Sequence, residues 1–205
     1  MDAYLALIDQ LIDKKVLKTP HIIEAFRAVH RKHFLPEQMA EGVGLDVPLP
    51  IGSGQTNSQP YTVAFMLELL SPKPGQNVLD IGFGSGWTSA LLAYIVGRKG
   101  KVYAFEVVRQ LCEFGKKNIE KFGFIRQGRV KVFCKNAAIG SAEFASFDRI
   151  LVSAAAKSLP DQWILQLATD ARLVAPVKHS IWLVEKHSDK IKRKEYPGFS
   201  FVPLV

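Results

Sequence analysis

A glycine-rich segment carries the clearest chemical signal in this chain. Residues 78–86 read Val-Leu-Asp-Ile-Gly-Phe-Gly-Ser-Gly, so an apolar run with one acidic residue leads into glycines at every second position. Glycine lets the backbone turn sharply and approach a ligand without an obstructing Cβ atom. A helix that begins after such a turn offers free N–H groups to the same ligand. The segment therefore predicts a cofactor site between a buried strand and a helix.

The order of the glycines and the acid indicates which cofactor is bound. A dinucleotide fingerprint has the form G-x-G-x-x-G, whereas the third glycine here comes one position earlier. Asp80 precedes the turn, where a carboxylate would repel a pyrophosphate but suits a cationic sulfonium. The turn therefore favours S-adenosylmethionine over a nicotinamide dinucleotide. A turn that binds no ligand is the alternative, and Trp87 after it could contact the cofactor or pack the helix.

A second carboxylate, Glu106, follows the apolar run 102–105. An acid about 20 residues after a glycine-rich turn can accept hydrogen bonds from both ribose hydroxyls of a nucleoside cofactor. Such an acid could instead stabilise the N-terminus of the following helix. We expect Glu106 to bind the ribose.

The surrounding pattern predicts the scaffold that positions these groups. From residue 76 onward, apolar runs of strand length alternate with helical segments. This alternation favours an α/β, Rossmann-like fold, with a doubly wound, mostly parallel sheet and helices on both faces. The expected strands are 77–81, 101–105, 129–134, 148–153 and 172–177, and the expected helices are 61–70, 87–96, 109–122 and 160–167.

The two ends of the chain differ from this core. Residues 1–40 have the apolar spacing of helices and predict an N-terminal helical extension. Residues 41–60 are crowded with glycine and proline, which predicts a long loop, and long loops are often functional. In the tail, 181–185, 190–195 and 199–204 predict antiparallel strands added at one edge of the sheet.

The length of 205 residues predicts one domain. Its expected parts are 1–60 (helical extension and substrate loop), 61–178 (cofactor-binding core) and 179–205 (C-terminal edge strands).

Residues 48–60 read Pro-Leu-Pro-Ile-Gly-Ser-Gly-Gln-Thr-Asn-Ser-Gln-Pro. This run closely resembles the signature P-L-P-I-G-x-G-Q-T-I-S-x-P of the protein-L-isoaspartate O-methyltransferases. The resemblance extends over nearly the whole chain, from the helices of 7–36 to the run 201–204. It implies an enzyme of protein repair, which transfers a methyl group from S-adenosylmethionine to the α-carboxylate of L-isoaspartyl residues in damaged proteins and leaves S-adenosylhomocysteine.

The resemblance also implies which residues form the site. Ser58 matches the hydroxyl beside the transferring methyl group and is the expected catalytic residue, although it could instead cap the helix that starts near Pro60. At pH 7 the substrate carboxylate is already ionised, so no general base is needed. The substrate loop would contain Gln55, Thr56 and Asn57. The residues implied in cofactor binding are Thr56, Ser58, Asp80, Gly82, Gly84, Ser85, Gly86, Glu106 and Asn136.

Four positions depart from the family's usual pattern. Where the family has Gly-Asp-Gly after its third strand, with the Asp contacting the adenine amino group, this chain has Lys135-Asn136-Ala137. The amide oxygen of Asn136 remains an acceptor. Asn57 replaces an aliphatic residue, Asp170-Ala171 replaces a glycine pair, and His30 replaces a proline. A non-catalytic or altered-substrate relative is therefore one alternative.

A nucleic-acid methyltransferase is the other alternative, because the formal net charge of +8 attracts anions. Such enzymes usually carry an N-P-P-Y-like motif after the fourth strand, whereas this chain has Ser153-Ala154-Ala155-Ala156. We therefore expect isoaspartyl-containing proteins or peptides as partners, no stable nucleic-acid partner, and a monomer. The charge would serve solubility, or speed encounter with acidic substrates.

The cysteines and histidines carry no metal or redox motif. Cys112 and Cys134 form no C-x-x-C pair, and two cysteines in a chain of this size predict buried thiols in a reducing compartment. No signal peptide or membrane-spanning run is recognisable. A cytoplasmic protein is expected. The five histidines lack a metal-ligand spacing, so no metal is expected.

Overall fold

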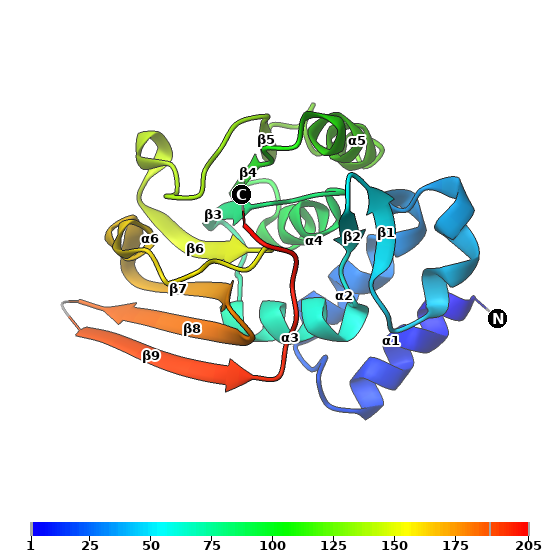
Figure 1. Ribbon diagram of the computed structural model, residues 1–205, viewed down its shortest axis with the longest axis horizontal. Coiled ribbons are helices and arrows are strands. Elements are labelled where there is room, and N and C mark those ends of the chain that lie inside the picture. The colour runs from blue at the N-terminus through cyan, green and yellow to red at the C-terminus, as the bar shows by residue number, and fades with distance from the viewer. Residues whose placement is uncertain (1, 189, 205) are drawn as a thin grey trace.

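The computed structural model describes residues 2–188 and 190–204, and a seven-stranded sheet forms its centre (Figure 1). The strand order is β5-β4-β3-β6-β7-β8-β9. Strands β3 to β7 pair in parallel, and β8 and β9 continue the sheet as antiparallel neighbours. This arrangement confirms the predicted fold class. The strands are β3 (Asn77–Ile81), β4 (Lys101–Phe105), β5 (Val130–Phe133), β6 (Phe147–Val152), β7 (Leu167–Val177), β8 (Ser180–His187) and β9 (Lys190–Pro197).

Helices cover the two faces of this sheet unequally. Successive side chains of a strand point to opposite faces, so Val78 belongs to one apolar core and Leu79 to the other. The first core contains side chains from α1 to α5, whereas α6 contributes Trp163 to the second. Helices α1 and α2 form the predicted N-terminal extension. The helices are α1 (Ala3–Asp13), α2 (Pro20–Ala28), α3 (Pro60–Leu70), α4 (Trp87–Val96), α5 (Arg109–Glu120) and α6 (Asp161–Leu165), with 3₁₀ turns η1 (Arg31–Phe34), η2 (Glu37–Gly44) and η3 (Ala142–Phe144).

Residues 41–60 are more regular than their composition predicted. Strands β1 (Leu49–Gly52) and β2 (Gln55–Asn57) pair as an antiparallel hairpin. Gly52, Ser53 and Gly54 have φ of 95°, 51° and 68°. The expectation of a long loop was wrong, because three successive residues in the left-handed region close a hairpin.

The third expected strand of the tail, 199–204, was also wrong. Gly198 has a φ of 95° and turns the chain off the end of β9. The segment then crosses to the carboxyl ends of the parallel strands (red in Figure 1). There the N–H of Ala155 donates to the carbonyl of Val202, and the N–H of Leu204 donates to Ala155, each at 2.8 Å. Its apolar residues therefore cover the end of the central sheet instead of extending the edge.

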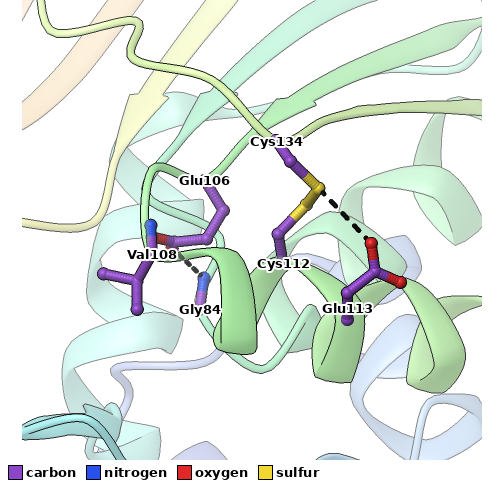
Figure 2. The surroundings of a disulfide bond; sticks show 6 residues. All are labelled: Gly84, Glu106, Val108, Cys112, Glu113 and Cys134. Carbon is purple, nitrogen blue, oxygen red and sulfur yellow. Dashed lines mark hydrogen bonds between the residues drawn. A yellow bond between two sulfur atoms is a disulfide. The ribbon is translucent and has the colours of Figure 1, made fainter.

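Cys112 and Cys134 form a disulfide, so the expectation of two buried thiols was wrong. Cys112 lies on α5 and is buried, whereas Cys134 directly follows β5 and is exposed. Helix α5 follows β4, whose neighbour is β5, and this connection brings the two Cα atoms to 5.6 Å, within disulfide range. Figure 2 shows the bond beside Glu106. Among the described helices, none is long and apolar enough to cross a membrane.

Candidate active site

A cavity opens at the carboxyl ends of the central strands. Strand β3 lies between β4 and β6, so the direction of chain progression reverses here, which is where open α/β sheets bind ligands. The cavity is lined by the glycine turn, the hairpin strand β2, the ends of β4 and β5, and the C-terminal segment. Of the predicted residues it brings together Gln55, Thr56, Asn57, Ser58, Gly82, Gly84, Ser85, Glu106 and Asn136.

The glycines of the turn have different functions. Gly82, Gly84 and Gly86 all have positive φ, at 77°, 53° and 89°. Gly82 and Gly84 line the cavity. Gly86 does not, and a Cβ there would lie 2.8 Å from the carbonyl oxygen of Gly115 on α5. Gly86 is therefore required for the close packing of the turn against α5.

Glu106 holds the turn from the other side. It is 7% exposed and lines the cavity. Its Oε2 accepts from the N–H of Gly84 and its Oε1 from the N–H of Val108, each at 2.9 Å (Figure 2). Val108 is the residue that precedes α5, so Glu106 satisfies a donor at the start of that helix and still presents a carboxylate to the cavity.

Asp80 lies behind the turn, outside the cavity lining. It is fully buried, and its Oδ2 accepts from the hydroxyls of Ser89 at 2.6 Å and Thr88 at 3.0 Å. Its Oδ1 has no partner among the described residues. Burial raises the pKa of Asp80 to about 6, although these two hydrogen bonds lower it. Asp80 therefore acts on the site by anchoring the first turn of α4.

Ser58 lies where the hairpin leads into α3. The alternative that it caps α3 was wrong, because Gln59 holds the cap position and the first free N–H, that of Tyr61, donates to Oδ1 of Asp46 at 2.8 Å. Ser58 lines the cavity. Its hydroxyl is thus not needed to satisfy the helix terminus.

A buried arginine that the sequence did not reveal organises this region. Arg31 has no exposed surface. Its Nε donates to Oδ1 of Asn57 at 2.7 Å. Its two terminal nitrogens donate to backbone carbonyls on both sides of the hairpin, those of Leu45, Val47, Asn57 and Ser58, at 2.8–3.3 Å. The guanidinium also lies over the ring of Trp87, 5.5 Å from its centre. Arg31 therefore fixes the loop that carries Ser58.

Residues 3–205 match the family model of protein-L-isoaspartate(D-aspartate) O-methyltransferases. The chain belongs to this family. It is 39% identical to a protein-L-isoaspartate O-methyltransferase of Methanopyrus kandleri over 204 residues, covering 97% of this chain and 89% of that one. Its identity to the enzyme of Methanococcus aeolicus is 36%, with 98% and 93% covered.

Solved structures of the family share the fold. A protein-L-isoaspartate O-methyltransferase from Plasmodium falciparum, crystallised with S-adenosylhomocysteine, aligns with a TM-score of 0.84 at 23% identity, covering 98% of each chain. A second structure of the same name aligns with a TM-score of 0.86 at 27% identity, covering 98% of this chain and 65% of that one.

The chain is accordingly an S-adenosylmethionine-dependent methyltransferase of the isoaspartate family, and its cavity fits that cofactor. S-adenosylmethionine has a nucleoside end, an amino-acid end and a methyl sulfonium between them. Its site needs glycines where the ligand lies close to the backbone, an acceptor for the ribose hydroxyls and apolar walls. The cavity has all three. Its lining includes the glycines Gly82 and Gly84, the acceptor Glu106, and the apolar residues Phe105, Val107 and Leu111.

The segment Lys135-Asn136-Ala137, one of the departures from the family pattern, presents a hydrogen-bond acceptor at the cavity. Asn136 lines the cavity, and its Oδ1 accepts from the N–H of Ala138 at 2.7 Å, which holds the side chain in one orientation. The ammonium of Lys135 lies over the rings of Phe133 and Phe105, 5.3 and 5.7 Å from their centres. It also pairs with Glu143 at 3.6 Å.

Several lining residues of this methyltransferase were not found from the sequence. Val202, Pro203 and Leu204 reach the cavity only because the tail leaves the sheet. Trp87 packs edge-on against Phe26, as one of its two alternatives predicted. It also lines the cavity, and its contact with the cofactor stays a prediction. In residues 2–188 and 190–204, no cluster of three or more His, Cys, Asp or Glu side chains could hold a metal ion.

Changing Glu106 to glutamine is expected to weaken binding of S-adenosylhomocysteine roughly 10- to 100-fold. The amide has only one acceptor atom, so either Gly84 or Val108 loses its hydrogen bond and the turn is no longer fixed. Isothermal titration calorimetry measures the Kd. Glu24→Gln, on the exposed face of α2, is the matched control and should bind as the wild type does. Equal Kd values for Glu106→Gln and wild type would contradict the role.

Proposed function

We propose that this chain repairs proteins by methylating the α-carboxylate of L-isoaspartyl residues, with Ser58 as the residue that positions the carboxylate. One observation carries the proposal. A second hollow, lined by Pro48, Gln59, Thr62 and Phe201, meets the cofactor cavity, and Thr56, Ser58, Ser153 and Val202 line both. A carboxylate bound in this second hollow would reach the cofactor's methyl group at Ser58.

The main task of the protein in this reaction is to position the substrate carboxylate against the methyl group. S-adenosylmethionine supplies an electrophilic methyl group on a sulfonium. The substrate carboxylate is ionised at neutral pH and needs no base. The Ser58 hydroxyl would donate to one carboxylate oxygen and orient the other, and the C-terminal segment at Phe201 and Val202 would exclude water. Positioning of this kind supplies up to roughly 7–11 kcal/mol of a barrier.

Different residues of the cavity wall are proposed to bind different parts of the cofactor. Asn136 would accept from the adenine amino group and Glu106 from the ribose hydroxyls. Gly82 and Gly84 would let the backbone approach the ligand, and Ser85 would reach its amino-acid end. Their common position on the cavity wall supports these roles.

Methyl transfer to a synthetic isoaspartyl peptide tests the proposal. With labelled S-adenosylmethionine, the isoaspartyl peptide should become base-labile methyl ester, and the matched aspartyl peptide should not. Transfer to neither peptide, or equally to both, would contradict the function. Transfer to an RNA or DNA mixture instead would favour the nucleic-acid alternative.

We further propose that the protein acts in the cytoplasm as a monomer without a stable nucleic-acid partner. Lysines 190, 192 and 194 on the exposed edge strand β9 support a monomer, because edge lysines discourage strand pairing between chains.

Among helices of the described residues, none could span a membrane. The disulfide is an argument against a strongly reducing compartment, and fractionation of cells decides the location.

A further inference from the structure

Asn57, one of the four departures from the family pattern, links two parts of the site. It is 3% exposed and lies at the end of β2. Its Oδ1 accepts from Nε of Arg31 at 2.7 Å, and its Nδ2 donates to Oγ of Ser85 at 2.9 Å. An aliphatic residue could make neither bond. Asn57 thus connects the substrate loop directly to the glycine turn.

The direction of these hydrogen bonds is fixed by chemistry. Arginine has five N–H donors and no acceptor, so the amide oxygen of Asn57 must face Arg31. The amide nitrogen then faces Ser85 and can only donate. Oγ of Ser85 is therefore the acceptor in this pair, and its own proton must point elsewhere. Arg31 sets the direction of the Ser85 hydroxyl through Asn57.

The N-terminus of α4, next to Ser85, can attract an anion. Ser85 is 3% exposed and lines the cavity. It directly precedes Gly86, the N-cap of α4, whose positive end attracts negative charge. Its backbone carbonyl accepts from Nδ2 of Asn118 at 3.1 Å, which holds the residue in place. A donor fixed at this point suits a carboxylate, and the amino-acid end of the cofactor carries one.

We propose that Asn57 is a positioning residue that orients the Ser85 hydroxyl as a donor toward the carboxylate of the cofactor. The proposal rests on the assignment of S-adenosylmethionine and its product to this cavity. It predicts that Asn57 affects ligands with the amino-acid end and leaves the nucleoside end alone. A residue that only supported the fold would affect both.

Asn57→Asp separates the two hydrogen bonds. A carboxylate still accepts from Arg31, so the loop anchor is retained, but it cannot donate to Ser85. The hydroxyl would then donate to the new carboxylate and turn away from the ligand. We expect the Kd of S-adenosylhomocysteine to rise about tenfold. The Kd of 5′-methylthioadenosine, which lacks the amino-acid end, should stay within about twofold. Calorimetry measures both values without turnover.

A double-mutant cycle distinguishes orientation from simple charge repulsion. In a Ser85→Ala background, Asn57→Asp should cause no further loss of affinity for S-adenosylhomocysteine. Asn57→Leu, which removes the donor without adding charge, should shift the ratio of the two Kd values in the same direction. Gln10→Glu adds the same charge on the exposed face of α1 and should leave both Kd values unchanged.

Two results would overturn the proposal. One is an unchanged ratio of the two Kd values in both Asn57 variants, as equal losses for both ligands would give. The other is a loss that persists in the Ser85→Ala background. A wild-type protein that binds neither ligand would overturn the cofactor assignment as well. Binding of both ligands with no transfer to the isoaspartyl peptide would contradict the proposed substrate. The role of Asn57 would still be tested by the two Kd values.

Discussion

Ser58→Ala is expected to lower kcat with an isoaspartyl peptide about 100-fold, while the Kd of S-adenosylhomocysteine changes less than about threefold. A misplacement of the reacting groups by about 1 Å can cost about 10² in rate. Ser58 lines both the cofactor cavity and the second hollow, and its hydroxyl does not cap α3. Its loss should therefore affect the placement of the carboxylate far more than binding of the cofactor.

Parallel measurements of kcat, KM and Kd check this expectation. Ser158→Ala, an exposed serine after β6, is the matched control and should behave as the wild type does. Equal losses in kcat and in cofactor affinity would indicate that Ser58 serves cofactor binding instead. A normal kcat would remove Ser58 from the reaction.

The parallel core was predictable because its strands are buried on both faces. Runs such as 77–81 and 101–105 are short and mostly apolar, with a glycine at one end of each, and the structure places β3 and β4 at these residues. The tail segment 199–204 has a similar composition but is no strand. Composition does not specify the surface that an apolar run covers, and at Gly198 the chain turns so that these partly buried residues lie against the end of the sheet. Which surface covers an apolar run is a tertiary property.

The site was predictable where the chemistry is local. The glycine turn, Glu106 and the Ser58 loop each depend on a few neighbouring residues, and the structure brings them to one cavity. Arg31 was missed because it lies beside Lys32, and two adjacent basic residues are typical of a solvent-exposed segment. Arg31 is buried because backbone carbonyls 14 to 27 positions further along the chain, such as those of Leu45 and Ser58, require hydrogen-bond donors. The disulfide also depends on a distant contact.

Two of the departures from the family pattern have partners in the structure. Asp170 has a φ of 57°, a conformation that Asp tolerates better than most residues, and its carboxylate lies 2.9 Å from Nδ1 of His187. Nδ1 of His30 accepts from the N–H of Lys32 at the start of η1, and its Nε2 lies 3.1 Å from the Asp2 carboxylate. These substitutions bring their own hydrogen bonds, so they are compatible with the same backbone.

Arg31→Met is expected to destabilise the protein by roughly 3 kcal/mol, because several loop carbonyls and Oδ1 of Asn57 lose their donors together. For a chain of this size the melting temperature should fall by roughly 6–12 °C. Burial lowers the pKa of Arg31 to about 10, so the guanidinium is still charged at neutral pH and donates through all its N–H groups. Arg31→Lys keeps the charge but lacks the planar fork, and its loss should be intermediate.

Arg27→Met is the matched control for this prediction. Arg27 lies on α2 and pairs with Asp9 at 3.1 Å, with 55% and 64% of the two side chains exposed. Exposed pairs of this kind contribute about 0–1 kcal/mol, so its melting temperature should stay near that of the wild type. Urea denaturation of all three variants gives the free energies of unfolding. If Arg31→Met and Arg27→Met lost the same small amount, the loop carbonyls would be satisfied without Arg31, and the anchor of Ser58 and Asn57 would have to lie elsewhere.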